Sequence, residues 1–493
     1  MRRLIITICC IFLSMFAWAG IHTYANQSVL SEGNIVKVSV SETGIHCIPY
    51  DTLKVWGLRP ADVRVLGYGG GILSENFTLA RWDDVPSVAF HMEKGADGVF
   101  NSGDYILFYA QGVTRWDLVN SRWCHTQNPY SNYGYYFISD SAGEQRLIEN
   151  QTAVDNTQEI VDVDWYTYYA VHEQDLVNLL DVNAGVNGGG REFYGELLNA
   201  NQPKRTINFS TTNVRTDLPS YCLVDLAATS STSSTIEVRM NESTKMGMTA
   251  AISVSDNYTR AEPATIKLES KATTTGEQQV EIEFRNTSAG ALAYLNYVEV
   301  NIPCELKMRG KEMAISNTSK MMQAPYIRFT MSNATAQTEI WRVTDGVNIE
   351  RMAVERNGNK LIWIGDNANA EKYIALTPTA TGWLKPKKVG RIKNQNLHAL
   401  QDIDYVIICP EEFKEPATRL AKKHEEIDNL TWAIVSDEEV YNEFSSGTPD
   451  ASAYRWLMKM LYDRKQSDRA MSVLLLGYGS YDNRKILSRS GNG

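Results

Sequence analysis

The sequence predicts a multidomain protein with a β-rich N-terminal region, an antiparallel β-sandwich and a final, incomplete α/β lobe built on a parallel sheet. Three observations indicate this. The length of 493 residues exceeds the ~250–300 residues at which a single core stops growing. Short runs with period-two alternation recur through the first 400 residues. Beyond residue 403, unbroken apolar runs alternate with segments of helical periodicity, as in a sheet covered on both faces.

Residues 1–25 have the features of a secretory signal peptide. Two arginines follow Met1, and Leu4–Trp18 is apolar but short for a bilayer span. Ala17–Ala19 and Thr23–Ala25 offer two small-x-small cleavage sites. A membrane anchor is the alternative interpretation, but no later run approaches ~18 apolar residues. We therefore expect an exported mature chain without a transmembrane helix.

The composition is that of an ordinary globular protein. The chain is 43% hydrophobic and carries 48 basic and 58 acidic residues, a formal net charge of −10. Duplex binding needs a cationic surface that releases counterions. The charge therefore argues against nucleic acid as a partner.

Cysteine usage does not indicate a disulfide framework. Five cysteines follow the signal peptide, and they are odd in number and widely spread, whereas disulfide scaffolds are dense and even. At most two bridges can form among them. The five are Cys47, Cys124, Cys222, Cys304 and Cys409.

Residues 26–200 are predicted to form an aromatic-rich β domain. Two aromatic runs, Tyr130–Ile138 and Trp165–Tyr169, favour a packed core or interface over the alternative of a carbohydrate-binding platform. The glycines at 69–71 suit a turn because glycine adopts backbone angles that other residues avoid. Residues 185–190 are expected to be a flexible loop. The expected strands are Asn34–Val40, Val63–Tyr68 and Gly103–Tyr109.

Residues 201–400 are predicted to form an antiparallel β-sandwich, because strand-like runs recur between polar turns without helical periodicity. Pro386–Lys393 carries five basic residues and is predicted to be a linker or a solvated loop. The expected strands are Thr206–Phe209, Tyr221–Leu226, Thr235–Met240, Thr265–Leu268, Gln279–Phe284, Tyr297–Ile302, Tyr326–Met331, Glu339–Val343, Leu361–Ile364 and Tyr373–Leu376.

Residues 401–493 are predicted to be the first lobe of an α/β domain, truncated after three parallel strands. Apolar runs at Val406–Cys409, Trp432–Val435 and Val473–Leu476 supply those strands. A sheet cut at this point leaves an uncovered edge and an apolar face. We therefore expect the chain to be the N-terminal part of a longer protein.

Two helices are predicted between these strands. Pro416 cannot lie deep inside a helix, so the first helix is expected to begin near it and to run to Ile427. Thr448 is the expected N-cap of the second helix, with Pro449 at its first position. A glycine-rich turn, Gly477–Ser480, follows the third strand.

Candidates for cysteine chemistry are weak. Cys124 and His125 are adjacent, so their side chains diverge on an extended backbone, whereas a nucleophile and its base must meet. Cys409 ends a buried strand and His424 lies on the apolar face of a helix. A structural cysteine and a core histidine are favoured over a catalytic pair.

Metal and phosphate motifs are also unsupported. The histidines show no HxxxH or HExxH spacing and the cysteines no CxxC, so zinc is not indicated. Asp97–Asp104 resembles a calcium loop, but its oxygen ligands lack the required spacing and a hairpin turn is expected. Gly477 and Gly479 follow a strand without the third glycine or the lysine of a phosphate-binding loop.

The C-terminal motifs carry a resemblance to a known family. Tyr441–Asp450 (YNEFSSGTPD), Leu461–Arg464 (LYDR) and Leu474–Asp482 (LLLGYGSYD) resemble the gingipain family of cysteine peptidases. The order of a signal peptide, an aromatic β region, the motif Gly190–Glu196 (GREFYGE), a β-sandwich and a peptidase segment is similar as well. The resemblance covers essentially the whole chain in architecture.

The resemblance implies a peptidase of two α/β lobes, of which this chain contains most of the first. In the family, the second lobe carries the catalytic histidine, in a Gly-His-Gly-like loop, and a later cysteine. Neither motif occurs here, so no residue of this chain is predicted to be catalytic, cofactor-binding or metal-ligating. Tyr478 stands where the family usually has an acidic residue. Calcium is the cofactor that the family suggests, and none is predicted from the residues.

The function implied is that of a type IX secretion sortase and signal peptidase at the cell surface or outer membrane of a Gram-negative bacterium. Such an enzyme removes C-terminal sorting domains from cargo proteins and attaches the cargo to the surface by cysteine-dependent transpeptidation. Its expected partners are that cargo and outer-membrane secretion components. This chain is expected to be inactive alone. The alternative is a non-catalytic, exported β-rich binding or assembly protein that retains only the supporting lobe.

Overall fold

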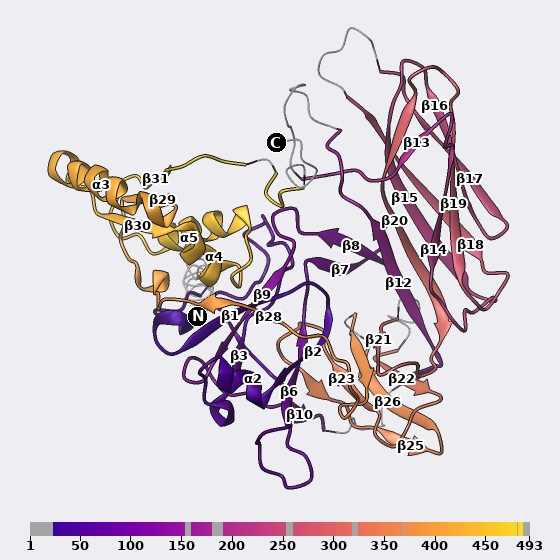
Figure 1. The fold of residues 1–493 in the computed structure, drawn as a ribbon, viewed down its shortest axis with the longest axis horizontal. Coiled ribbons are helices and arrows are strands. Elements are labelled where there is room, and N and C mark those ends of the chain that lie inside the picture. Colours follow the sequence, from indigo (N-terminus) through magenta and orange to yellow (C-terminus); the bar gives the residue numbers. More distant parts are fainter. Residues whose placement is uncertain are drawn as a thin grey trace, which may run out of the picture.

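The computed structural model describes residues 23–152, 159–179, 191–252, 260–317, 324–367, 370–480 and 482–486. Most of the predicted signal peptide, the predicted loop at 185–190 and Gly190 lie outside these ranges. Among the residues described, no helix has the length and apolarity needed to cross a membrane. The protein is β-rich with a parallel α/β unit at its C-terminal end, as the sequence predicts (Figure 1).

The N-terminal β unit contains two sheets with one shared core. The first sheet has the order β28-β1-β9-β3-β4 and the second the order β2-β6-β5. Val38, Phe108 and Tyr136 are fully buried in that core. The strands are β1 (Ile35–Val40), β2 (Gly44–Pro49), β3 (Arg64–Leu66), β4 (Ser87–Val88), β5 (His91–Glu93), β6 (Tyr105–Ala110), β9 (Gly134–Ser139) and β28 (Lys387–Arg391), with the short helix α2 (Tyr50–Val55).

One sequence prediction is wrong in this unit. The segment Pro386–Lys393 is not a linker or solvated loop, because β28 within it pairs antiparallel with β1 and places Val36 opposite Arg391. Its side chains are mostly exposed, so the segment lacks the apolar alternation that marks a strand. Backbone pairing at the edge of the sheet makes it a strand.

The β-sandwich is confirmed, and its two sheets enclose an apolar core to which strands such as β19 contribute every second side chain. One sheet has the order β12-β20-β15-β18, with β13 also on β20, and the other the order β14-β19-β16-β17. The strands are β12 (Trp165–Glu173), β13 (Leu197–Asn199), β14 (Lys204–Phe209), β15 (Pro219–Thr229), β16 (Ser234–Met240), β17 (Ser243–Thr249), β18 (Glu262–Lys271), β19 (Gln278–Arg285) and β20 (Leu292–Glu305).

Strand pairing crosses the division that the sequence predicts at residue 200. Trp165–Glu173 lies in the sandwich sheet because it pairs antiparallel with β20. The strands after residue 310 form two further sheets rather than extending the sandwich. These sheets consist of β10 (Glu149–Asn150), β24 (Glu350–Arg351), β23 (Glu339–Arg342), β27 (Tyr373–Leu376) and β21 (Glu312–Ile315), and of β11 (Ile160–Val163), β22 (Tyr326–Met331), β26 (Lys360–Asp366) and β25 (Glu355–Asn357). A hairpin of β7 (Thr114–Val119) and β8 (Arg122–Gln127) lies beside them.

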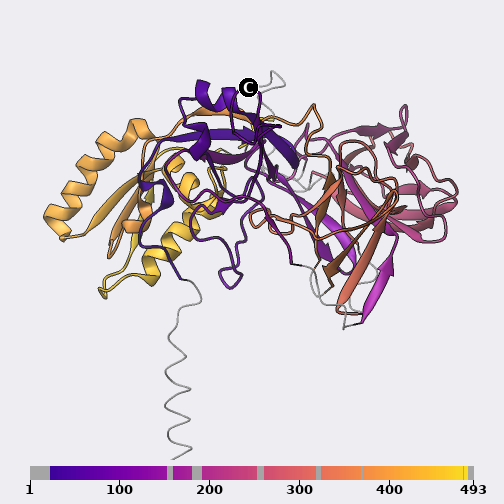
Figure 2. The ribbon, with the colours of Figure 1, turned by 90° about the horizontal axis from the view of Figure 1, so that it is seen from below.

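The α/β unit has a three-stranded parallel sheet of order β30-β29-β31. Apolar side chains of α3 cover one face of the sheet, and those of α4 and α5 cover the other. Figure 2 shows this unit at one end of the molecule, the sandwich at the other and the N-terminal β unit between them. The elements are β29 (Tyr405–Cys409), α3 (Lys414–Asp428), β30 (Trp432–Ser436), α4 (Asp437–Phe444), α5 (Ala451–Asp463) and β31 (Ser472–Leu475).

The predicted strands and the first helix are confirmed here, whereas two details differ. Helix α4 was not predicted; it begins directly after β30 with a capping box, in which Ser436 and Glu439 bond each other's backbone N–H groups. The cap of α5 is Asp450 rather than Thr448, since the Asp450 carboxylate accepts the N–H of Ser452. Thr448 instead donates its hydroxyl proton to the carbonyl of Gly69 at 3.1 Å.

Candidate functional site at the carboxyl edge of the parallel sheet

A cavity of about 490 Å³ lies where β29 and β31 end. The chain leaves the central strand β29 towards α3 on one face, whereas α4 and α5 cover the other face. Open α/β sheets bind ligands at such a divergence, outside the carboxyl ends of the strands. The lining includes Cys409 and Pro410 after β29, the Gly477–Ser480 turn after β31, and Tyr441 and Tyr454 from the helices.

The ionisable groups of this cavity are held by structural contacts. The hydroxyls of Tyr441 and Tyr454 bond each other, and burial together with Tyr454 raises the pKa of Tyr441. The Asp450 carboxylate accepts backbone N–H groups of Ser452 and Leu73, both at 2.8 Å. Burial raises the pKa of Asp450. These groups can orient a bound ligand, but they do not form a nucleophile with its base.

Cys409 and His424 do not form a pair. Cys409 is buried at the carboxyl end of β29, and burial raises the pKa of its thiol. His424 packs edge-on against Tyr405, at the opposite end of the strand, with ring centroids 5.0 Å apart. Four residues of strand span about 13 Å. His424 is also half-exposed and bonds Asp428 at 2.7 Å, so the expectation of a core histidine is wrong.

Cys124 and His125 do not form a catalytic pair either. The His125 ring lies between two carboxylates, with Nδ1 2.8 Å from Glu299 and Nε2 3.5 Å from Glu173. Burial alone would lower the pKa of His125, but the two carboxylates raise it to about 9. Burial raises the pKa of the Cys124 thiol. The histidine is therefore a buried cation, and the thiol is not activated.

The remaining cysteines of the described residues are also unreactive thiols. The five described cysteines, which include Cys124 and Cys409, are not joined by disulfides. Burial raises the pKa of Cys47 to about 11 and those of Cys222 and Cys304 to about 12. A thiolate is the nucleophile in cysteine peptidases. The described residues therefore contain no activated cysteine nucleophile.

A buried group that the sequence did not reveal joins Asp84, His398 and Glu443. Their ligand-type atoms all lie within 4.8 Å of one another, a spacing compatible with a metal ion. His398 Nδ1 is 2.6 Å from Glu443, and Nε2 is 3.6 Å from Asp83. The Asp84 carboxylate accepts the Val29 N–H at 2.5 Å and the Ser28 hydroxyl at 3.0 Å. Protein groups bond the Asp84 and Glu443 carboxylates and Nδ1 of His398, so the cluster acts as an ionic link between the N-terminal β unit and the α/β unit.

The segment that resembled a calcium loop is a turn. It connects β5 to β6, which pair antiparallel, as expected for a hairpin. The Asp97 carboxylate accepts the Val99 N–H at 3.0 Å and the Asn101 side-chain amide at 2.7 Å. Its oxygens therefore hold the turn itself.

Comparison with known proteins confirms the family resemblance. Residues 398–492 match the peptidase family C25. This segment is therefore similar to the C25 peptidases, the gingipain family that the sequence motifs indicate. No curated protein sequence matches the chain. The match begins at His398 and so covers the whole α/β unit with its cavity.

The whole chain is similar to PorU. The crystal structure of dimeric latent PorU from Porphyromonas gingivalis matches with a TM-score of 0.79 and 26% sequence identity, over 94% of this chain and 43% of that chain. The chain thus spans less than half the length of the PorU structure. A carbohydrate-binding module of family CBM36, in complex with calcium and xylotriose, matches 27% of this chain and 98% of its own at 14% identity, with a TM-score of only 0.18. That similarity carries no functional argument.

Proposed function

We propose that this chain provides the N-terminal β units and the supporting α/β lobe of an exported, PorU-like cysteine peptidase that acts as a sortase. Its cargo would be proteins with C-terminal sorting domains, which the enzyme removes before joining the cargo to the cell surface. The similarity to PorU over 94% of the chain is the observation that carries this proposal. The family C25 match supports the reaction class.

The nucleophile of this reaction must come from outside the described residues. Each described cysteine is a thiol whose pKa burial raises. A second α/β lobe that carries a cysteine and a histidine, as the family resemblance implies, would supply the missing pair. The cavity at the carboxyl edge of the sheet would then lie next to the reacting groups.

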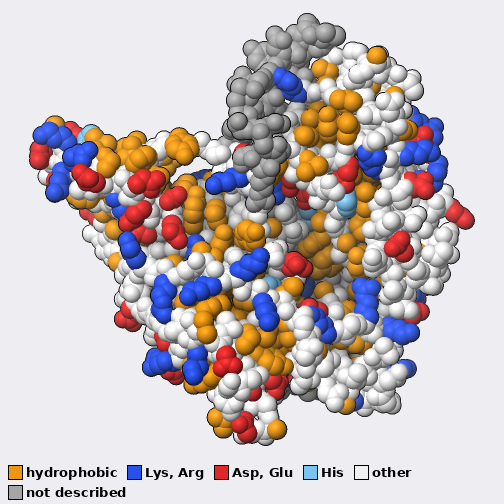
Figure 3. Space-filling model, viewed as in Figure 1, with side chains coloured by type: hydrophobic (Ala, Val, Ile, Leu, Met, Phe, Trp, Pro, Cys, Tyr) orange, Lys and Arg blue, Asp and Glu red, His pale blue; other side chains and the backbone are white. Residues whose placement is uncertain are grey.

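The edge strand β31 is a suitable place for that second lobe. β31 is the last strand of its sheet in the described residues, so one side of its backbone has no strand partner there. Leu475 is 61% exposed and Tyr462 is 67% exposed beside it. A groove of about 590 Å³ runs along this face, with Phe77 and Met458 in its wall. Figure 3 shows hydrophobic side chains gathered along this border of the α/β unit.

The proposed chemistry is acyl transfer through a thioester. The thiolate attacks the carbonyl carbon before the sorting domain, and backbone N–H groups stabilise the resulting oxyanion. As the C–N bond breaks, the histidine gives its proton to the leaving amine. Water or an amine on a surface glycolipid then attacks the thioester and gives up a proton to the histidine, and the C–S bond breaks to release the thiolate. The products are free or surface-attached cargo.

Deletion of the gene and mass spectrometry of exported cargo test this proposal. We expect cargo from the deletion strain to retain its C-terminal sorting domain and to be absent from the cell surface. In the intact gene, changing Val473 and Leu475 together to aspartate should reproduce this loss. Ile427→Asp, which changes an apolar side chain that is 71% exposed on α3, is the matched control and should leave processing intact.

Normal processing in the deletion strain would overturn the sortase proposal in favour of the non-catalytic binding or assembly protein. Normal processing in the β31 variant alone would retain the sortase proposal and reject β31 as the contact for a second lobe.

A further inference from the structure

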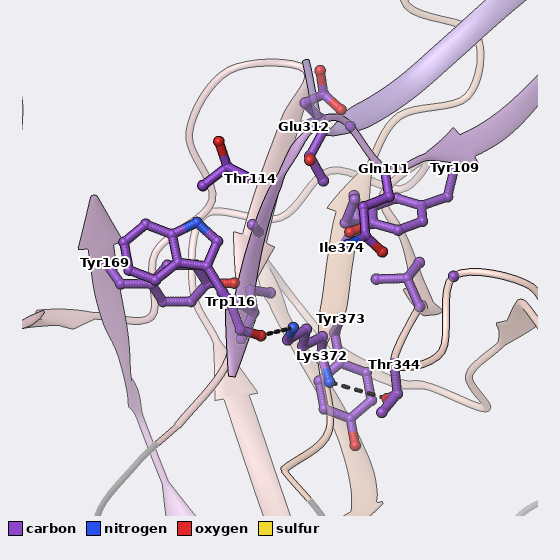
Figure 4. A pocket seen from close by; sticks show the side chains of 16 residues that line it. Tyr109, Gln111, Thr114, Trp116, Tyr169, Glu312, Thr344, Lys372, Tyr373 and Ile374 are labelled. Atoms are coloured by element: carbon purple, nitrogen blue, oxygen red, sulfur yellow. Dashed lines mark hydrogen bonds between the residues drawn. The ribbon is translucent and has the colours of Figure 1, made fainter. Parts of the chain in front are cut away.

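A separate cavity of about 370 Å³ lies where three β units meet, outside the α/β unit. Its wall combines the ends of β2 and β6 from the N-terminal unit, β12 from the sandwich, and β21 and β27 from a third sheet, with β7 along one side. Figure 4 shows the side chains that line it. The inference drawn from this cavity is independent of the peptidase assignment.

Aromatic rings form much of the wall. Trp116 and Tyr169 pack with ring centroids 4.7 Å apart, and Trp123 holds Tyr169 from behind at 5.2 Å. Tyr109 lies on the other side of the cavity, towards Gln111 and Ile374 (Figure 4). The four rings that line the cavity, those of Tyr109, Trp116, Tyr169 and Tyr373, belong to four different strands, each paired in a sheet. The wall is therefore preformed and offers aromatic faces to a ligand.

One carboxylate in this wall lacks a counter-ion among the described residues. Glu312 accepts the backbone N–H of Ile45 at 3.2 Å, and no described lysine, arginine or histidine nitrogen lies within the 4.0 Å of an ion pair. Burial raises the pKa of Glu312, and Glu42 raises it further, while the Ile45 N–H and Lys311 lower it. Because Glu312 is partly buried and has no counter-ion, a cation in the cavity would be stabilised beside it.

The lysine of the cavity is already held by other groups. Lys372 Nζ donates to the carbonyl oxygen of Trp116 at 2.6 Å and lies 5.0 Å from the centroid of the Trp123 ring. In Figure 4 its ammonium group points towards Trp116, at the end of the cavity away from Glu312. The cavity therefore has a carboxylate without a counter-ion at one end, Glu312, and at the other end an ammonium group that protein groups already bond, that of Lys372.

We propose that this cavity binds a ligand with an alkylammonium or guanidinium group, whose cation pairs with Glu312 and whose aliphatic part packs on Tyr109 and Trp116. Aromatic faces attract such cations, and the attraction is stronger where water is excluded. Gln111 lines the same space, and its side-chain amide bonds no described residue, so its carbonyl oxygen is a second acceptor for the N–H groups of the ligand. A lysine or arginine side chain of a peptide and a free polyamine share this chemistry.

Binding of small probes to the purified chain tests the proposal. Calorimetry and quenching of tryptophan fluorescence would be measured with butylamine, agmatine, butyrate and glucose, and with an acetylated, amidated arginine peptide. We expect the two amines to bind, and butyrate and glucose not to bind. Tighter binding of the arginine peptide than of agmatine identifies a peptide as the source of the cation, and the reverse identifies a small amine.

Variants locate the site and separate binding from folding. Glu312→Gln removes the charge but keeps an oxygen for the Ile45 N–H, so it should weaken agmatine binding at least tenfold without lowering the melting temperature. Glu42→Gln, which changes an exposed neighbouring carboxylate, is the matched control and should retain binding within about threefold. Unchanged agmatine affinity in Glu312→Gln, binding of butyrate or glucose in place of the amines, or no binding by any probe would overturn the proposal.

Discussion

At the scale of single residues, His398 shows how a buried charge joins two units of the molecule. Burial alone would lower the pKa of His398, but the nearby carboxylates of Asp83, Asp84 and Glu443 raise it to about 9. The histidine pKa in the unfolded chain is about 6.5. The folded protein therefore binds the proton on His398 more tightly than the unfolded chain does. The stabilisation is fully present below pH 6.5 and is lost as the pH rises through 9.

Replacement of His398 by asparagine should therefore destabilise the protein most at low pH. We expect a loss of up to about 3 kcal/mol at pH 6, at about 1.4 kcal/mol per pKa unit, and a much smaller loss at pH 9.5. Urea unfolding of both proteins at several pH values measures this difference. His46→Asn is the control: His46 is equally buried, but burial lowers its pKa to about 4, so it stays neutral throughout. A loss independent of pH would contradict the ionic role.

The contacts of Tyr24 and Ala25 indicate where the predicted signal peptide is cleaved. The Tyr24 hydroxyl donates to Asp463 at 2.7 Å, and the Ala25 N–H donates to Asp83 at 2.6 Å. The Arg464 guanidinium donates to the Ala25 carbonyl and lies over the Tyr24 ring. Cleavage after Ala25 would remove these contacts. We therefore predict cleavage after Ala19, so N-terminal sequencing of the exported protein should begin at Gly20, and a start at Asn26 would refute this.

At the scale of elements, the sequence was informative where burial imposes a pattern. β29 is predicted because it is buried at every residue and apolar throughout. Sandwich strands such as β19 are predicted because every second residue is buried and apolar. β28 was missed because an exposed edge strand is defined by backbone pairing rather than by apolar side chains. α4 was missed because eight residues give barely two turns of periodicity. Its only sequence signal is the Ser436–Glu439 capping box.

This capping box makes a testable contribution to α4. The Ser436 side chain accepts the Glu439 N–H, one of the groups that a helix N-terminus leaves without an intrahelical partner. Ser436→Ala should destabilise the helix by about 1 kcal/mol. Hydrogen exchange of the α4 amides should accelerate about fivefold, whereas Ser472→Ala, an exposed serine on β31, should leave it unchanged. Equal protection in both variants would show that packing alone holds α4.

At the scale of the whole molecule, sites form between segments that are distant in the sequence. Glu312, Tyr109 and Trp116 meet only because three sheets converge, and no local spacing relates them. The same holds for Asp84 and His398. Sequence motifs identified the C25 segment, because its motifs lie within one short stretch, but they could not identify these two sites.

The α/β unit also depends on the N-terminal β unit for its buried polar groups. Tyr68 N–H donates to Ser446 at 3.0 Å, Leu73 N–H donates to Asp450 at 2.8 Å, and buried Lys37 donates to Asn442 at 2.9 Å. Separation of the two units would leave these groups exposed or unpaired. A buried polar group that loses its partner costs about 1–3 kcal/mol.

Residues 398–493, which contain the family C25 segment, should therefore not fold when expressed alone. Circular dichroism and thermal unfolding should show no cooperative transition, because several buried bonds are lost together and Trp456 loses its edge-on contact with Phe77 at 4.8 Å. Co-expression with residues 23–397 as a second chain should restore a stable complex.

Lys37→Met in that second chain keeps the buried aliphatic part of the side chain but removes the bond to Asn442. This variant should weaken the complex more than Lys54→Met, which changes an exposed side chain on α2. A cooperative transition in the isolated segment would show that the α/β unit is an independent domain.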